Sequence, residues 1–129
     1  MDYNEIIKLK VNYIGENALS FFDEDKLFII YGKVNDNDLR SYSIIVESEA
    51  VENDIEKGMV LSFNDQDFEI LEVGCEANNT LKSLTHMTLR FQDFNDPSNS
   101  EDILPGSILL NGMPKVFPNI GSYITIKTK

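Results

Sequence analysis

Three side chains suited to carrying a phosphoryl group stand at alternate positions of one short stretch, Leu84–Phe91. The stretch reads LTHMTLRF and contains His86, the one histidine of the chain, followed by Thr88 and Arg90. A neutral imidazole nitrogen is a nucleophile, whereas a guanidinium and a hydroxyl donate hydrogen bonds to phosphoryl oxygens. The residue types therefore suit phosphoryl transfer, with His86 as the acceptor and Thr88 and Arg90 as the groups that hold the oxygens.

The same stretch alternates as a β-strand does, and this alternation decides where its side chains point. Successive side chains of a strand lie on opposite faces of the sheet. The expected core residues are Met87, Leu89 and Phe91. His86, Thr88 and Arg90 then share the other face, with neighbours two apart separated by roughly 7 Å. A solvated strand face that carries a histidine without any function has the same pattern, so this alternative stays open.

Short strand-like runs dominate the rest of the chain, and most are bounded by Gly, Asn or Asp. They predict strands at Glu5–Tyr13, Lys26–Gly32, Tyr42–Glu47, Met59–Phe63, Gln66–Val73, His86–Gln92, Ser107–Leu110 and Ser122–Lys127. Helical patterns are limited to Glu16–Phe22 and Asn78–Leu84, which are short enough to cross the end of a barrel. We therefore predict an all-β fold with one or two short helices, closed into a barrel because closure removes exposed strand edges.

We expect one domain over residues 1–129, because no repeat, low-complexity tract or proline-rich linker divides the sequence. Asn64 and Asp65 separate two apolar runs and predict a tight hairpin. Four aromatic residues fall in strand runs and are expected in the core or at its rim. They are Phe28, Tyr31, Tyr42 and Phe63.

The charge of the chain argues against two classes of partner. Lysine and arginine number 11 against 22 aspartates and glutamates, and the net charge of −11 repels nucleic acid and anionic lipid surfaces. The start of the chain, MDYNEIIKLKV, has no signal-peptide pattern, and no apolar run is long enough to span a bilayer. We therefore expect a cytoplasmic protein. A single cysteine, Cys75, is consistent with a reducing compartment, and we expect it to be partly buried.

Metal and cofactor sites are not supported by the remaining motifs. The acidic stretches Asn35–Asp38 and Asp93–Asp96 carry oxygen ligands, yet both lack the glycine and the bidentate glutamate of a calcium loop, so they are interpreted as solvated turns. One histidine and one cysteine cannot form a zinc site. No phosphate-binding glycine loop, dinucleotide motif or serine-nucleophile motif is present. No metal and no cofactor are therefore expected.

The stretch Leu84–Phe91 resembles a Gly-His-Val-Thr-Leu-Arg-Phe segment of the glucitol/sorbitol-specific enzyme IIA family of the bacterial phosphotransferase system (PTS). Shorter similarities follow in the order of that family across nearly the whole chain. They lie at Tyr13–Gly15, Leu71–Gly74, Pro105–Ser107 and Asn119–Ser122. The resemblance implies a closed, mostly antiparallel barrel. It also implies a phosphotransferase component that accepts a phosphoryl group from the phosphocarrier HPr and passes it to a IIB partner during sugar uptake.

One departure from the family pattern concerns the phosphoacceptor itself. The family has an Ile-His-x-His type segment that aligns with Ile45–Ser48, which places Val46 at the acceptor position. Either His86 accepts the phosphoryl group, or the chain is a non-catalytic barrel that binds or regulates a protein partner. An acyl phosphate on Glu47 is a further alternative. The resemblance implies only indirect membrane association, through the IIC component, and unpaired strand edges make a homodimer a further expectation.

Overall fold

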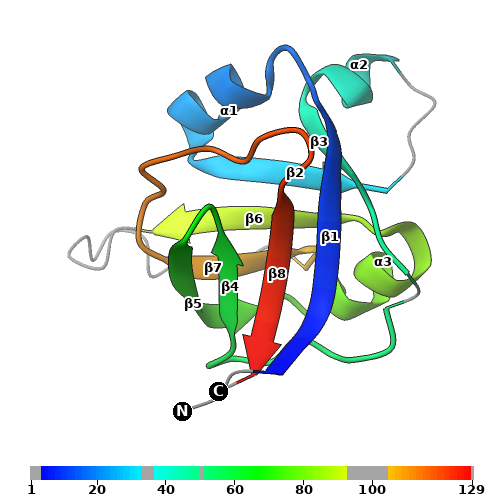
Figure 1. Cartoon of the computed structure of the whole chain (residues 1–129), viewed down its shortest axis with the longest axis vertical. Helices are drawn as coiled ribbons and strands as arrows, with labels where there is room; N and C mark the ends of the chain where they lie inside the picture. Colours follow the sequence, from blue (N-terminus) through cyan, green and yellow to red (C-terminus); the bar gives the residue numbers. More distant parts are fainter. Residues whose placement is uncertain (1–3, 33–36, 50, 93–104, 129) are drawn as a thin grey trace.

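The computed structural model of the protein has strands that close into a barrel, and it describes residues 4–32, 37–49, 51–92 and 105–128 (Figure 1). Within these ranges the elements, in chain order, are β1 (Asn4–Ile14), α1 (Ala18–Asp25), β2 (Leu27–Tyr31), α2 (Asn37–Ser41), β3 (Ser43–Glu47), β4 (Val60–Phe63), β5 (Gln66–Val73), α3 (Ala77–Leu84), β6 (Met87–Gln92), β7 (Ser107–Asn111) and β8 (Tyr123–Thr128). The predicted closed all-β barrel is confirmed. The structure has one more helix than expected, because the five residues of α2 are too few to show a helical period.

The order of strands around the barrel is β1-β3-β2-β6-β7-β5-β4-β8, and β8 returns to pair with β1. The pairs β2–β3 and β6–β7 are parallel. Every other neighbouring pair of the described strands is antiparallel. The mostly antiparallel barrel that the resemblance implied is therefore confirmed, and β6 lies in the wall between β2 and β7.

The topology contains a two-fold internal repeat that is not visible in the sequence. If β1, β2, β3 and β4 are exchanged with β5, β6, β7 and β8 respectively, every strand keeps equivalent neighbours around the barrel. Each parallel pair then replaces a parallel pair, and each antiparallel pair replaces an antiparallel pair. The match extends to single hydrogen bonds. The N–H of Gly15 donates to the carbonyl of Ser43 over 2.8 Å, and the N–H of Gly74 donates to the carbonyl of Ser107 over the same distance. The two halves therefore share one backbone plan with different side chains.

Two of the helices, α1 and α3, pack against the barrel and bury a few apolar side chains. Ala18 and Phe22 of α1 are buried, as are Ala77 and Leu81 of α3. Figure 1 shows α1 and α2 at the top of the view and α3 to the right of β1. The two predicted helical segments are thus confirmed, with boundaries that differ by up to three residues, and both helices contribute to the hydrophobic core.

The four aromatic residues singled out in the sequence divide between the core and the surface. Phe28 and Phe63 belong to the buried core, as expected. Tyr42 precedes β3 instead of beginning it, is 44% exposed, and packs edge-on against Phe21. Tyr31 lies on the outer face of β2, where it contacts the histidine described below.

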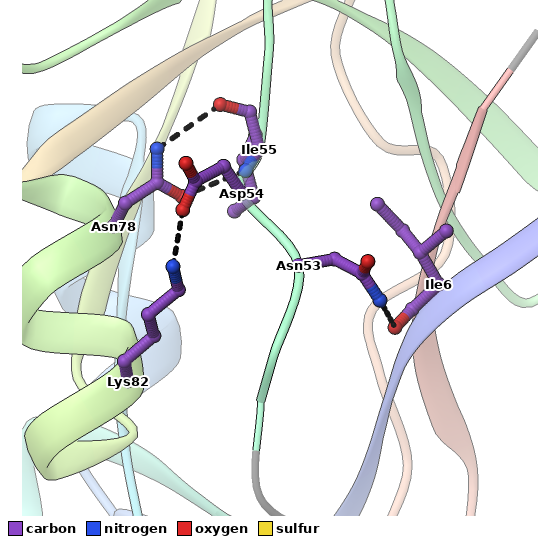
Figure 2. Close-up of polar contacts among 6 residues, drawn as sticks. All are labelled: Ile6, Asn53, Asp54, Ile55, Asn78 and Lys82. Atoms are coloured by element: carbon purple, nitrogen blue, oxygen red, sulfur yellow. Dashed lines mark hydrogen bonds and ion pairs between the residues drawn. The ribbon is translucent and has the colours of Figure 1, made fainter.

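The loop after β3 is held against α3 by hydrogen bonds from an asparagine of that helix (Figure 2). The side-chain amide of Asn78 accepts from the N–H of Ile55 over 2.7 Å and donates to the carbonyl of the same residue over 3.1 Å. Lys82, one turn further along α3, forms an ion pair with Asp54. These contacts seat the Ile55 side chain, which is 2% exposed, in the core.

Candidate functional site

His86 is positioned by the turn that joins α3 to β6. Helix α3 ends at Leu84 and is capped by Thr85, a residue in the left-handed conformation (φ 50°), and β6 begins directly after the histidine. The backbone N–H of His86 donates to the carbonyl of Thr80 over 3.2 Å, which fixes the turn to the helix. The histidine side chain is half-buried, so it lies in the wall of the barrel within reach of solvent.

The imidazole ring is held by two residues of β2. Its Nδ1 lies 3.1 Å from the carbonyl oxygen of Ile30, and its plane stacks on the ring of Tyr31 with the centroids 3.9 Å apart and the planes 19° apart. A carbonyl oxygen only accepts hydrogen bonds, so Nδ1 carries the proton in this arrangement. In the neutral ring Nε2 then keeps its lone pair, and within the described part of the chain it has no hydrogen-bond partner.

The alternation predicted for this strand is confirmed. The residues on the core face are buried, and they are Met87, Leu89 and Phe91. Thr88 and Arg90 are half-buried on the outer face, where the β2 residues opposite them are Ile29 and Leu27. His86, Thr88 and Arg90 therefore follow one another along one side of the strand. Among the described residues, neither Thr88 nor Arg90 hydrogen-bonds to the imidazole, and their α-carbons lie roughly 7 and 13 Å away along an extended chain.

The position that aligns with the family's acceptor histidine lies close to His86 but faces the core. Val46 is fully buried and belongs to the hydrophobic core. Val46, Glu47 and Ser48 border a hollow of about 370 Å³ whose opposite wall includes Thr85, the residue before His86. Glu47 is exposed at the end of β3. The hollow thus reaches from the Val46 position to the residue before His86, and at Val46 it offers only an aliphatic side chain.

Sequence reasoning missed the two groups that orient the imidazole. Tyr31 was expected in the core or at its rim because it falls in a strand pattern. A sequence motif contains no information on which backbone carbonyl contacts a side chain, so the role of Ile30 could not be predicted. Both contacts depend on the pairing of β2 with β6, whose register places Ile30 opposite Met87. Only knowledge of this pairing would have identified them.

The structure shows no metal-binding arrangement among the described residues. Among the described residues, no group of three or more His, Cys, Asp or Glu side chains is arranged to hold a metal ion. Of the two acidic stretches, Asp93–Asp96 and the first half of Asn35–Asp38 lie outside the described residues. The expectation for Cys75 was wrong, because the thiol is exposed at the turn before α3, where no strand covers it.

None of the helices that the structure describes has the length and apolar character that crossing a bilayer requires.

Comparison with known proteins agrees with the fold and with the resemblance noted from the sequence. Residues 6–125 match the family model described as PTS system glucitol/sorbitol-specific IIA component. The crystal structure of a PTS system IIA component from Enterococcus faecalis V583 is 27% identical, covers 91% of this chain and 96% of its own, and superposes with a TM-score of 0.70. Comparison with curated proteins gives no significant match. The chain therefore belongs to the glucitol/sorbitol-specific IIA component family of the PTS.

Proposed function

We propose that this protein is a phosphocarrier that accepts a phosphoryl group from phospho-HPr on His86 and passes it to a IIB component during uptake of glucitol (sorbitol). Its site of action is the cytoplasm, and it meets the membrane only through the IIC component. Membership of the IIA family supports the type of reaction and the class of partner. The role of His86 is inferred from the geometry of its ring.

The observation that carries the proposal is the hydrogen bond between Nδ1 of His86 and the carbonyl of Ile30. In the transfer step, the Nε2 lone pair attacks the phosphorus, the P–N bond of the donor histidine breaks, and its electron pair stays on the donor imidazole. The positive charge that then develops on the His86 ring lies against the Ile30 carbonyl dipole, which stabilises it. The Tyr31 ring prevents the imidazole from turning away from this orientation.

Arg90 and Thr88 are the groups on the same strand face that are suited to hold the transferred oxygens. A guanidinium donates two parallel hydrogen bonds to a phosphoryl group, and a hydroxyl adds a third. Both side chains are half-buried and, among the described residues, Arg90 forms no ion pair. The arginine is therefore available to turn along the strand toward a phosphorylated His86.

Phosphorylation with phosphoenolpyruvate, enzyme I and HPr tests this proposal. The expected product is labelled once, in an acid-labile and base-stable bond, and His86→Ala abolishes the label. Arg90→Lys should slow labelling because a lysine cannot form the two-pronged contact, whereas Lys115→Ala, a surface cation on another loop, serves as the matched control. Absence of label on the wild-type protein contradicts the proposal, and a base-labile label moves the acceptor to a carboxylate such as Glu47.

A second candidate function rests on Val46. Because the position of the family acceptor is occupied by a buried aliphatic side chain, the chain is alternatively a non-catalytic barrel that binds and regulates a protein partner. This alternative predicts that His86→Ala leaves binding to that partner unchanged. Loss of partner binding and of label in the same variant counts against it.

A further inference from the structure

The wall of the barrel has an opening along the first half of β1. β1 pairs with β8 from Asn4 to Lys10, but its pairing with β3 begins only at Lys10, opposite Glu47. From Glu5 to Leu9 the edge of β1 that faces β3 therefore has none of the described strands beside it. Beyond Glu47 the chain bows away, and Asn53 returns to donate to the carbonyl of Ile6 over 3.5 Å (Figure 2).

The unpaired backbone groups in this opening belong to Lys8. The N–H of Val11 donates to Ser122, and the carbonyl of Val11 accepts from Gly121, so the backbone groups of Val11 face β8. Backbone groups alternate in direction along a strand, so those of Leu9 also face β8 and those of Lys8 face the opening. No backbone hydrogen bond joins Lys8 to the described residues on that side. An exposed N–H and C=O in this arrangement is a template for another strand.

A groove of about 690 Å³ runs along this edge. We call it the β1 groove, and the residues that define it here are Ile6, Lys8, Lys10, Glu47, Ser48 and Val51. Its lining combines apolar and polar side chains, and Lys8 extends over the ring of Tyr123 with its ammonium 4.4 Å from the ring centroid. The groove therefore offers main-chain partners together with side-chain contacts, as strand addition requires.

The other half of the barrel closes the equivalent opening with its own chain. There the first half of β5 lacks β7 beside it, because the β5–β7 register begins only at Ile70. The amide of Gln66 instead accepts from the N–H of Lys115 over 2.5 Å and donates to the carbonyl of Val116 over 2.8 Å. Asn64 donates to the carbonyl of Phe117 over 2.6 Å. Among the described residues, the equivalent opening beside β1 is spanned only by the long contact from Asn53 to the carbonyl of Ile6, and no side chain of β1 holds the facing loop as Gln66 does.

The charges around the β1 groove favour a basic occupant. Three glutamates, Glu5, Glu47 and Glu49, line it against the two lysines Lys8 and Lys10, so the lining is acidic by one charge. None of the three glutamates forms an ion pair within the described part of the chain. The net charge of −11 adds a long-range field of the same sign. We propose that the β1 groove is a strand-addition site for an extended, positively charged segment of a partner protein.

Binding of a short fluorescent peptide of alternating lysine and valine tests the proposal. We expect the wild-type protein to bind it, and to bind a glutamate–valine peptide at least about tenfold more weakly. Methylation of the peptide's alternate backbone nitrogens should abolish binding. Glu5→Lys combined with Glu49→Lys should reverse the preference, whereas Glu69→Lys, on the surface of β5, should not.

Variants of Lys8 test whether the backbone N–H of this residue binds the peptide. Lys8→Pro removes the N–H that faces the opening, and proline is tolerated where that N–H faces solvent. We expect this variant to fold and to lose the peptide, while Lys8→Ala, which keeps the N–H, still binds it. In the free wild-type protein the Lys8 amide should exchange rapidly with solvent, and the bound peptide should slow that exchange.

Several results would overturn the proposal. These are a slowly exchanging Lys8 amide in the free protein, unchanged peptide binding by Lys8→Pro, and no binding of the basic peptide at millimolar concentration. Protection of Lys8 that grows with protein concentration in the absence of peptide would also overturn it, because the occupant would then be a second copy of the chain. If Lys8→Pro fails to fold because proline fixes φ and restricts the preceding residue, the exchange rate of the Lys8 amide in the wild-type protein, free and with peptide, decides the question instead.

Discussion

The imidazole of His86 lies flat against the ring of Tyr31, with the two centroids 3.9 Å apart, while its Nδ1 contacts the carbonyl of the preceding residue, Ile30. One short segment of β2 thus determines both the plane of the histidine and the nitrogen that carries its proton. This relationship links the register of two strands to the chemistry proposed for the site.

Replacing Tyr31 should therefore affect phosphorylation more than folding. Tyr31→Leu removes the flat surface that orients the imidazole, and we expect the rate of phosphorylation by phospho-HPr to fall roughly tenfold. Tyr31→Phe keeps the stack and should stay within about twofold of wild type. Tyr42→Leu, which alters an exposed tyrosine that packs on Phe21, is the control. Equal rates for Tyr31→Leu and wild type would show that Tyr31 does not orient the imidazole for transfer.

Thr85→Gly should stabilise the protein. Thr85 is a β-branched residue with φ 50°, a conformation that costs an L-residue about 1–2 kcal/mol and costs glycine little. Glycine loses more backbone entropy on folding, so we expect a net gain of about 0.5–1 kcal/mol in the free energy of unfolding. The resembled family segment has glycine at this position. Urea denaturation measures the change, and a loss of stability would contradict the assignment of strain to this turn.

Lys26 provides a matched comparison for that variant. It ends α1 in the other half of the barrel with φ 58°, as Thr85 ends α3. Lysine is not β-branched, so Lys26→Gly should increase the free energy of unfolding by less than Thr85→Gly does. The reverse order would show that side-chain branching is not the source of the strain.

Gly32→Ala should be destabilising because β2 ends in close contact with the turn that carries His86. A Cβ at position 32 would lie 2.6 Å from the Cβ of Thr85, and relief of such overpacking costs about 1–3 kcal/mol. Gly106→Ala is the control, because a Cβ there meets nothing within 4 Å. Thermal or urea unfolding of the two variants measures the difference, and equal stabilities would contradict the close approach.

Asn78→Ala should lower stability by removing the two hydrogen bonds that hold Ile55 (Figure 2). Backbone groups left without partners beside a buried side chain cost about 1–3 kcal/mol. Asn79→Ala changes the exposed neighbour, whose amide contacts Glu76, and should stay within about 0.5 kcal/mol of wild type. A neutral effect of Asn78→Ala would show that the loop is held by the Ile55 side chain alone.

The sequence predicted which faces of the strands are buried better than which strands are neighbours. Alternation correctly placed Met87 in the core and Arg90 on the outer face, because the period of two is a local property of an extended chain. The contact between Tyr31 and His86 could not be predicted in the same way, since it depends on the pairing of strands distant in sequence. Motif resemblance located His86, but no motif records a carbonyl or a stacking ring.

The internal repeat was missed for a related reason. The two halves share hydrogen-bond positions such as those of Gly15 and Gly74, whereas their side chains have diverged. A repeat of backbone geometry leaves no periodic residue pattern once different apolar residues fill equivalent places in the core. The open edge beside β1 follows from the register of β1 with β3 and β8, which the sequence does not show.

We propose that Nε2 of His86 accepts the phosphoryl group while Nδ1 remains protonated against the carbonyl of Ile30. Long-range ¹H–¹⁵N NMR of the imidazole, recorded after incubation with phosphoenolpyruvate, enzyme I and HPr, tests it directly. We expect a single phosphohistidine, substituted at Nε2, with a proton retained on Nδ1. A phosphoryl group on Nδ1, or an imidazole spectrum that is unchanged after the incubation, would contradict it.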